Sequence, residues 1–184
     1  MKRCSTSASR IFSNSIVLHT ERLTLARLSF DDADFIFELL NEPSFKRYIG
    51  DKGVRTRDDA LVYLREVPLR QYREFGYGLY RVGADGDDRA LGICGLVNRN
   101  EFPDPDLGFA FLQAHRGQGY AYESSLAVLG EARNALGLQR IIAMVDEDNE
   151  SSNYLLGKLG FRFEQMVTMP GETREIRQYV LEDW

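Results

Sequence analysis

The segment from residue 107 to residue 136 constrains the fold more than any other part of the chain. It begins with a continuous apolar run at 107–112, which is typical of a strand at the centre of a sheet covered on both faces. A polar turn with two glycines follows, and then apolar residues recur at helical spacing. A buried strand that leads through a glycine turn into an amphipathic helix predicts a mixed α/β or α+β fold.

The residues before this segment predict one strand, two helices and two further strands. Alternating apolar residues indicate a strand at 23–28, and Asp31 or Asp32 is placed to cap a helix that Pro43 ends. Thr56 and Asp59 have the spacing of an N-terminal capping box, so a second helix runs from there to about Phe75. Pro68 interrupts this second helix, and strands are expected at 76–82 and 91–97 around a turn at 85–88.

The residues after the segment complete the predicted sheet. We expect a buried strand at 140–145, a helix at 151–159 and a closing pair of strands at 161–169 and 174–181. The chain has 184 residues, of which 43% are hydrophobic, enough for one well-packed domain, placed at 20–184. Residues 1–19 are predicted to be a partly flexible extension, with an organelle transit peptide as the alternative, because they are rich in Ser and basic residues and lack acidic ones.

Charge and cysteine content exclude several classes of protein. Lys and Arg total 23 and Asp and Glu total 28, a net charge of −5, which argues against a dedicated nucleic-acid binder. No run approaches the roughly 20 apolar residues that a membrane helix needs. Cys4 and Cys94 lie in no CxxC motif or Cys/His cluster, so we predict no metal site and a reduced, cytoplasmic protein.

The turn at 113–121 has the chemistry of a phosphate site. The N-terminus of a helix offers unpaired backbone N–H groups to an anion, and Gly117 and Gly119 allow close approach of the backbone. Arg116 adds a fixed positive charge. The nucleotide-binding motif GxxxxGK[ST] is absent, and the dinucleotide motif GxGxxG fails because Tyr122 replaces its third glycine. The absence of both motifs argues against nucleotide binding by the turn.

What remains is Arg116, Gly119 and Ala121 at the spacing Arg-x-x-Gly-x-Ala, which resembles the pyrophosphate motif of the GNAT superfamily of N-acetyltransferases. Other matches resemble its RimJ/RimL-type branch and occur in the order found there. They are TERLTL at 20–25, with Ala26 before Arg27 where the branch often has Arg, then LGF at 107–109, RGQGYAYE at 116–123, NESS at 149–152 and KLGF at 158–161. The chain is identified as a member of this superfamily over about residues 20–180.

The resemblance implies a mixed, mostly antiparallel central sheet with helices on both faces, whose fourth and fifth strands splay apart. It implies acetyl-CoA as co-substrate and no metal. The pantetheine arm would enter the splay and pair with the strand at 107–112, with Phe111 and Leu112 nearest the turn, and Asn149 would also contact the arm. The expected pyrophosphate contacts are Arg116, Gly117, Gln118, Gly119, Tyr120 and Ala121.

The family reaction is direct transfer of an acetyl group from a thioester to a primary amine. Many members place a Tyr seven residues after the Asn to protonate the leaving thiolate, but this chain has Leu156 there. The RimJ/RimL-type branch commonly has Ser three residues after the Asn, which is Ser152. The resemblance therefore implies Ser152 as the group that hydrogen-bonds the leaving sulfur, and a capping role for the same hydroxyl stays open. Tyr154 is a further candidate acid.

Asp106 is the candidate general base, since relatives carry an acid near this position; a solvated carboxylate in a Pro-rich loop is the alternative. Cys94 could carry the acetyl group in a ping-pong route, but its apolar neighbours favour a buried, inert thiol.

The acceptor is left open by the sequence. A protein N-terminal amine predicts an open groove, whereas a small amine such as a polyamine, amino acid or antibiotic predicts a closed, acid-lined pocket. A non-catalytic sensor that binds coenzyme A is a third possibility. The protein is expected to be a monomer or homodimer.

Overall fold

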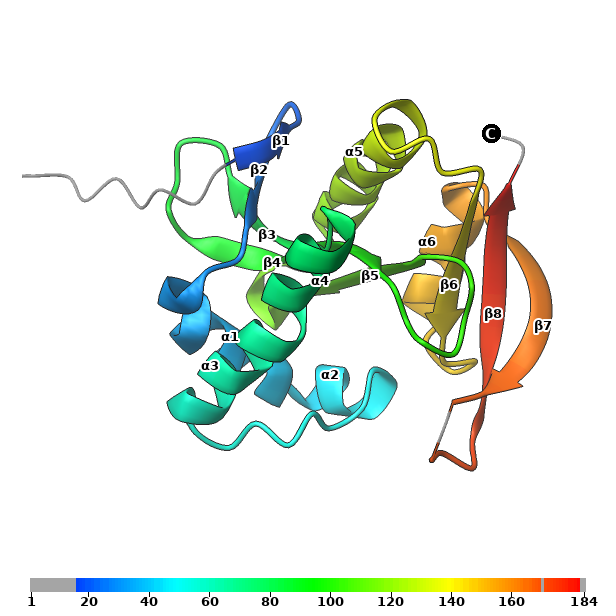
Figure 1. Ribbon diagram of the computed structural model, residues 1–184, viewed down its shortest axis with the longest axis horizontal. Helices are drawn as coiled ribbons and strands as arrows, with labels where there is room; N and C mark the ends of the chain where they lie inside the picture. Colours follow the sequence, from blue (N-terminus) through cyan, green and yellow to red (C-terminus); the bar gives the residue numbers. More distant parts are fainter. Residues whose placement is uncertain (1–15, 170, 183–184) are drawn as a thin grey trace, which may run out of the picture.

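The computed structural model describes residues 16–169 and 171–182. Within these residues eight strands form one sheet in the order β1-β2-β3-β4-β5-β6-β8-β7 (Figure 1). Neighbouring strands are antiparallel except for the parallel pair β5 and β6. The strands are β1 (Ile16–His19), β2 (Leu23–Arg27), β3 (Leu79–Ala84), β4 (Ala90–Val97), β5 (Asp106–Phe111), β6 (Arg140–Val145), β7 (Arg162–Thr168) and β8 (Glu175–Glu182).

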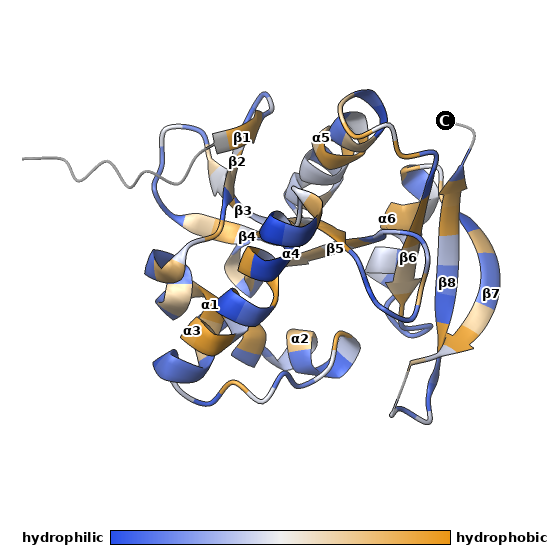
Figure 2. Ribbon diagram, in the orientation of Figure 1, coloured by the Kyte–Doolittle hydropathy of each residue, from blue (hydrophilic) through white to orange (hydrophobic). Residues whose placement is uncertain are grey.

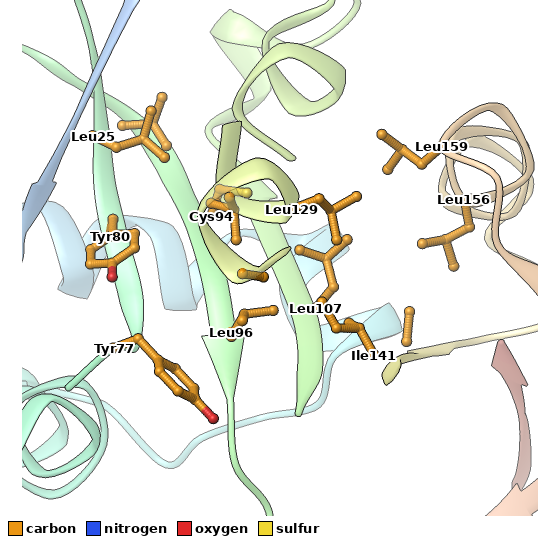
Figure 3. Packing of buried hydrophobic residues seen from close by; sticks show 14 of the residues in the cluster. Leu25, Tyr77, Tyr80, Cys94, Leu96, Leu107, Leu129, Ile141, Leu156 and Leu159 are labelled. Carbon is orange, nitrogen blue, oxygen red and sulfur yellow. The ribbon is translucent and has the colours of Figure 1, made fainter. Parts of the chain in front are cut away.

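Helices cover both faces of this sheet. They are α1 (Ala33–Asn41), α2 (Pro43–Tyr48), α3 (Arg57–Glu66), α4 (Pro68–Phe75), α5 (Tyr120–Asn134) and α6 (Glu150–Lys158). One buried cluster joins the sheet to α5 and α6, and the other joins it to α1 and α3. Figure 3 shows part of the first cluster, with Cys94 of β4, Leu107 of β5 and Leu129 of α5 among its members. None of the described helices is both long and apolar enough to cross a membrane.

The hydropathy of the strands agrees with their positions in the sheet. In Figure 2, β6 is coloured mostly hydrophobic, whereas β7 at the edge of the sheet is mostly hydrophilic. Nearly every residue of β7 is exposed, and this agrees with its position outside β8. The mixed, mostly antiparallel sheet with helices on both faces, expected from the resemblance, is therefore confirmed.

The predicted break between α3 and α4 is present. The Thr56 hydroxyl oxygen accepts from Asp59 N at 3.2 Å, and the Asp59 carboxylate accepts from Thr56 N at 2.8 Å, which is the capping box. Pro68 begins α4, because proline has no N–H to lose at the first position of a helix.

One local prediction was confirmed and one was wrong. Helix α1 ends at Asn41, because Pro43 forces the preceding Glu42 into an extended backbone (φ −59°, ψ 137°); Pro43 then begins α2, a helix that was not predicted. Ser29 rather than Asp31 or Asp32 makes the side-chain cap, and it caps a short 3-10 turn that precedes α1. The described part of the predicted extension, residues 16–19, forms β1; residues 1–15 lie outside the described residues.

The fork between β5 and β6 positions the site. These strands share a single register pair, Asp106 with Ile142, whereas β4 and β5 pair along all of β5. Ile142 N donates to Pro105 O at 2.9 Å, and beyond this point the two strands diverge (Figure 1). The strands predicted at 107–112 and 140–145 are β5 and β6, so the expected splay is confirmed.

Candidate active site

A cleft of about 430 Å³ lies where four parts of the chain meet. They are the end of β5, the glycine turn with the first turn of α5, one side of α6, and α2. The lining residues include the predicted Phe111, Arg116, Gly117, Gly119, Tyr120, Ala121, Asn149 and Ser152. The structure thus brings most of the sequence candidates into one place. No aspartate or glutamate lines the cleft within the described part of the chain.

The glycine turn ends in an uncapped helix. Gly117 (φ +73°) and Gly119 (φ +81°) adopt the left-handed conformation that favours glycine. No side chain caps α5, and its first helical hydrogen bond runs from Glu123 N to Gly119 O at 3.1 Å. The backbone N–H groups of residues 120–122 precede that bond and have no acceptor within the helix. They are available to an anion in the cleft.

Arg116 is held in place from two sides. Its Nε donates to Phe111 O at 2.7 Å, and its guanidinium is paired with the Glu42 carboxylate. The other oxygen of Glu42 accepts from Gln113 N at 2.8 Å. Glu42 lies between α1 and α2, so this contact ties the α2 wall of the cleft to the glycine turn. Sequence analysis missed Glu42, because nothing in a local pattern indicates a contact across 74 positions.

Arg22 is a second cation at the turn that sequence analysis did not assign. Its guanidinium donates to Gln118 O at 3.1 Å and to Glu123 at 2.7 Å, and it lies over the Tyr120 ring. Partial burial acts to raise the pKa of Glu123, but hydrogen bonds from Thr20 and Arg22 hold it below its ordinary value. The TERLTL match at 20–25 contains Arg22 and was the available signal.

The first turn of α6 presents the candidate catalytic serine. Asn149 caps this helix, because its Oδ1 accepts from Ser152 N at 3.2 Å and from the Ser151 hydroxyl at 3.0 Å. The Ser152 hydroxyl is therefore not the cap, and Ser152 lines the cleft. Leu156 is 1% exposed and belongs to the core. Tyr154 lines the cleft and is 76% exposed.

Asp106 is not among the residues that line the cleft. It is only 2% exposed, so the alternative of a solvated loop carboxylate was wrong. Its Oδ2 accepts from Arg99 Nε at 2.6 Å, and its Oδ1 accepts from Met144 N at 3.2 Å. Burial raises the pKa of this carboxyl, against the opposing effects of Arg99 and the Met144 N–H.

Two other predicted cofactor contacts also lie outside the lining of the cleft. Leu112 is buried in the cluster with α1 and α3, and its N–H donates to Leu91 O at 3.0 Å. Gln118 is exposed on the turn and points its amide toward Ala114 O. Position in a motif did not show on which side of the backbone each side chain lies.

Further lining residues came only from the structure. Phe45 and Tyr48 of α2, with Ile49 directly after it, form one wall, and α2 itself was not predicted. Lys158 and Tyr122 lie on the other side, with Lys158 Nζ 4.1 Å from the Tyr122 ring centroid. Lys158 belongs to the KLGF match, which was the available signal.

Cys94 does not line this cleft. The thiol is fully buried, and burial raises its pKa to about 11. It is therefore protonated at neutral pH and is a poor nucleophile. This agrees with an inert thiol and gives no support to a ping-pong route.

Comparison with known proteins places these features in a family. Residues 22–162 match the family described as the acetyltransferase (GNAT) domain. Over 153 residues the chain is 28% identical to the uncharacterized N-acetyltransferase YoaA of Bacillus subtilis (strain 168), covering 82% of this chain and 85% of YoaA.

Solved structures share the fold. An acetyltransferase from Agrobacterium tumefaciens str. C58 superposes with a TM-score of 0.77 at 22% identity, over 90% of this chain and 94% of that one. The ribosomal L7/L12 α-N-protein acetyltransferase RimL, in complex with coenzyme A, superposes with a TM-score of 0.76 at 16% identity, over 91% and 97%.

Proposed function

Because the chain belongs to the GNAT acetyltransferase family and is an N-acetyltransferase, we propose that it takes its acetyl group from acetyl-CoA and transfers it directly to the terminal α-amine of a protein. A small-molecule amine is the alternative acceptor. A non-catalytic sensor of coenzyme A, considered from the sequence, is the remaining alternative for the site.

The observation that carries the acetyl-CoA proposal is the continuity of the cleft. It runs from the end of β5, beyond the point where β5 and β6 stop pairing, to the uncapped N-terminus of α5. In this proposal the N–H groups of residues 120–122 bind the pyrophosphate, and Arg116 and Arg22 supply positive charge beside them. A net charge of −5 is no obstacle, since the local donors are positive. Phe111 and Asn149 line the same cleft and are assigned to the pantetheine arm.

Ser152 is assigned to the leaving group. When bound, the thioester would supply an activated carbonyl. The neutral amine would form the new carbon–nitrogen bond as the carbon–sulfur bond breaks, and the proton lost by the nitrogen would pass, directly or through solvent, to the departing thiolate. The Ser152 hydroxyl is free of the capping role, so it can donate a hydrogen bond to the departing sulfur. Asn149 orients Ser152 by capping the helix that carries it.

The charge of the cleft favours an α-amine over a polyamine as acceptor. A polyamine carries several positive charges and needs carboxylates around it, and none lines the cleft in the described residues. An α-amine has a pKa of about 7.7–8.0, against about 10.4 for a lysine side chain, so a useful fraction is neutral without a strong base. This fits a site whose nearest predicted base, Asp106, is paired and buried.

The likeness to the RimJ/RimL-type branch adds to this proposal. RimL, which shares the fold, is an α-N-protein acetyltransferase. A cytoplasmic location stays a prediction, supported by the free thiol of Cys94.

Calorimetric titration with acetyl-CoA tests the proposal. We expect binding in the micromolar range by the unaltered protein, and its loss in the double variant Arg116→Ala, Gly119→Asp. The new carboxylate would repel the pyrophosphate, and Gly119 (φ +81°) has a backbone conformation that aspartate tolerates less well. The variant Asp34→Asn, on the exposed face of α1, is the matched control and should bind normally. Absence of binding by the folded, unaltered protein would refute the enzyme and the sensor together.

A further inference from the structure

We propose that Asp106 is a positioning residue that holds the fork between β5 and β6 in its open form, so that the acetyl donor can enter between the strands. The expected effect on acetyl-CoA binding rests on the proposed function. The hydrogen bond between Met144 N and Asp106, from which the inference is argued, is part of the fold and does not depend on that function.

The backbone hydrogen bonds at the fork show what Asp106 replaces. Ile142 N donates to Pro105 O at 2.9 Å, and Asp106 with Ile142 is the single register pair of the two strands. In a continued parallel ladder the next donor of β6 would be Met144 N, and its acceptor would be Leu107 O. Met144 N instead donates to the Asp106 carboxylate at 3.2 Å. The side chain thus satisfies the first β6 donor that the divergence would leave without a partner.

Because the Asp106 side chain takes the place of a backbone acceptor, the edge of β5 is left for a ligand. Leu112 N donates to Leu91 O on the β4 side. The N–H and C=O groups of successive residues in a strand point to opposite sides, so those of Phe109 and Phe111 point toward β6. Phe111 O agrees with this, because it accepts from Arg116 Nε at 2.7 Å. Phe109 and Phe111 both line the cleft. Because Met144 N bonds to a side chain and not to Leu107 O, the ladder of β5 and β6 stops there, and the β6-facing edge of β5 at Phe109 and Phe111 is left for the amides of an entering ligand.

An aspartate suits this position because its second oxygen is also satisfied. Asp106 Oδ2 accepts from Arg99 Nε at 2.6 Å, and Arg99 follows β4. A carboxylate that is 98% buried needs such a partner to remain charged. The pair fixes the carboxylate at the fork, and it leaves no oxygen directed to the cleft, as a general base would require.

The experiment compares Asp106→Asn with Asp106→Ala. Amide hydrogen exchange of Met144, measured by NMR without ligand, reports the contact itself, and calorimetry reports the Kd of acetyl-CoA. Asn keeps an oxygen acceptor, so we expect Met144 to stay protected and the Kd to change by about threefold or less. Ala removes the acceptor, so protection and affinity should each fall by about tenfold or more. If Asn retains the protection of Met144 and the Kd, then Asp106 acts by positioning the strands and not by transferring a proton.

Asp104→Asn is the matched control, because Asp104 lies two residues before Asp106 and pairs with Arg140, not with Met144. Far-UV circular dichroism and thermal unfolding establish that each variant is folded. If Asp106→Ala keeps both the protection of Met144 and the parental Kd, the inference is wrong. It is also wrong if Asp106→Asn lowers turnover strongly and removes the pH dependence of the residual rate while the Kd stays unchanged. That result would identify Asp106 as a general base. If the unaltered protein fails to bind acetyl-CoA, the proposed function is wrong. The exchange of the Met144 amide then still shows whether Asp106 accepts its hydrogen bond at the fork.

Discussion

Ser152 and Ser151 are neighbours that the structure gives different tasks. Both line the cleft, but the Ser151 hydroxyl donates to Asn149 Oδ1, whereas Ser152 contributes its backbone N–H to the same oxygen. The hydroxyl of Ser152 is thereby left for the cleft. Leu156, where many relatives carry a Tyr, is enclosed in the core and offers no alternative donor.

Replacing Ser152 by Ala should lower kcat by about 10²-fold and leave the Kd of acetyl-CoA unchanged, because the lost hydrogen bond forms to the departing sulfur. Release of coenzyme A in the presence of N-terminal peptides measures kcat. Ser151→Ala is the control and should retain most of the activity. Equal activity of the two variants would remove Ser152 from the mechanism, and absence of turnover with every amine tested would favour a sensor.

The elements around the cleft are joined by a charged contact. Glu42 at the junction of α1 and α2 holds Arg116 of the glycine turn and also accepts from Gln113 N. In the proposed complex the pyrophosphate would share Arg116 with a carboxylate of like charge. The α2 wall and the phosphate turn therefore influence each other through Arg116.

Glu42→Gln should strengthen acetyl-CoA binding about threefold. Glutamine keeps the acceptor for Gln113 N and removes the competing negative charge, and the effect is small because solvent screens the partly exposed pair. In an Arg116→Gln background the same change should have little effect. Calorimetric Kd values for the two single variants and the double variant measure this coupling. A weaker affinity for Glu42→Gln would instead show that the carboxylate mainly orients Arg116.

For the whole molecule, the cleft exists because distant parts of the chain meet in the folded state. α2, the end of β5, the turn before α5 and the start of α6 each supply a wall. A ligand that touches all four binds only the folded protein, so it should stabilise the fold as a unit.

Acetyl-CoA at about 100 times its Kd should therefore raise the thermal midpoint by about 5–10 °C, since the linkage contributes about 2.7 kcal/mol for a domain of this size. Differential scanning calorimetry with and without the ligand measures the shift. The double variant Arg116→Ala, Gly119→Asp should show no shift. A shift of the same size in that variant would place the ligand away from the turn.

Most of the elements and their order in the chain could be predicted from local sequence, and β1 and α2 are the exceptions. Local chemistry is sufficient for the capping box at Thr56, the break at Pro68 and the apolar strand that leads into the glycine turn, because each depends on residues within one or two turns of chain. Motif order identified the family, and with it the splay of β5 and β6. The local error at Ser29 came from a position where two chemically sound alternatives compete, and α2 was missed because a short helix after a proline has no strong periodic pattern.

Which side chains enter the cleft depends on how distant elements pack. Leu112 belongs to the expected cofactor strand but is turned into the core, and Asp106 satisfies a backbone donor at the fork instead of facing the cleft. Arg22 and Glu42 reach the turn across 96 and 74 positions of sequence. Contacts of this kind depend on how whole elements pack and on which buried donors need an acceptor, and no local pattern of residues carries that information.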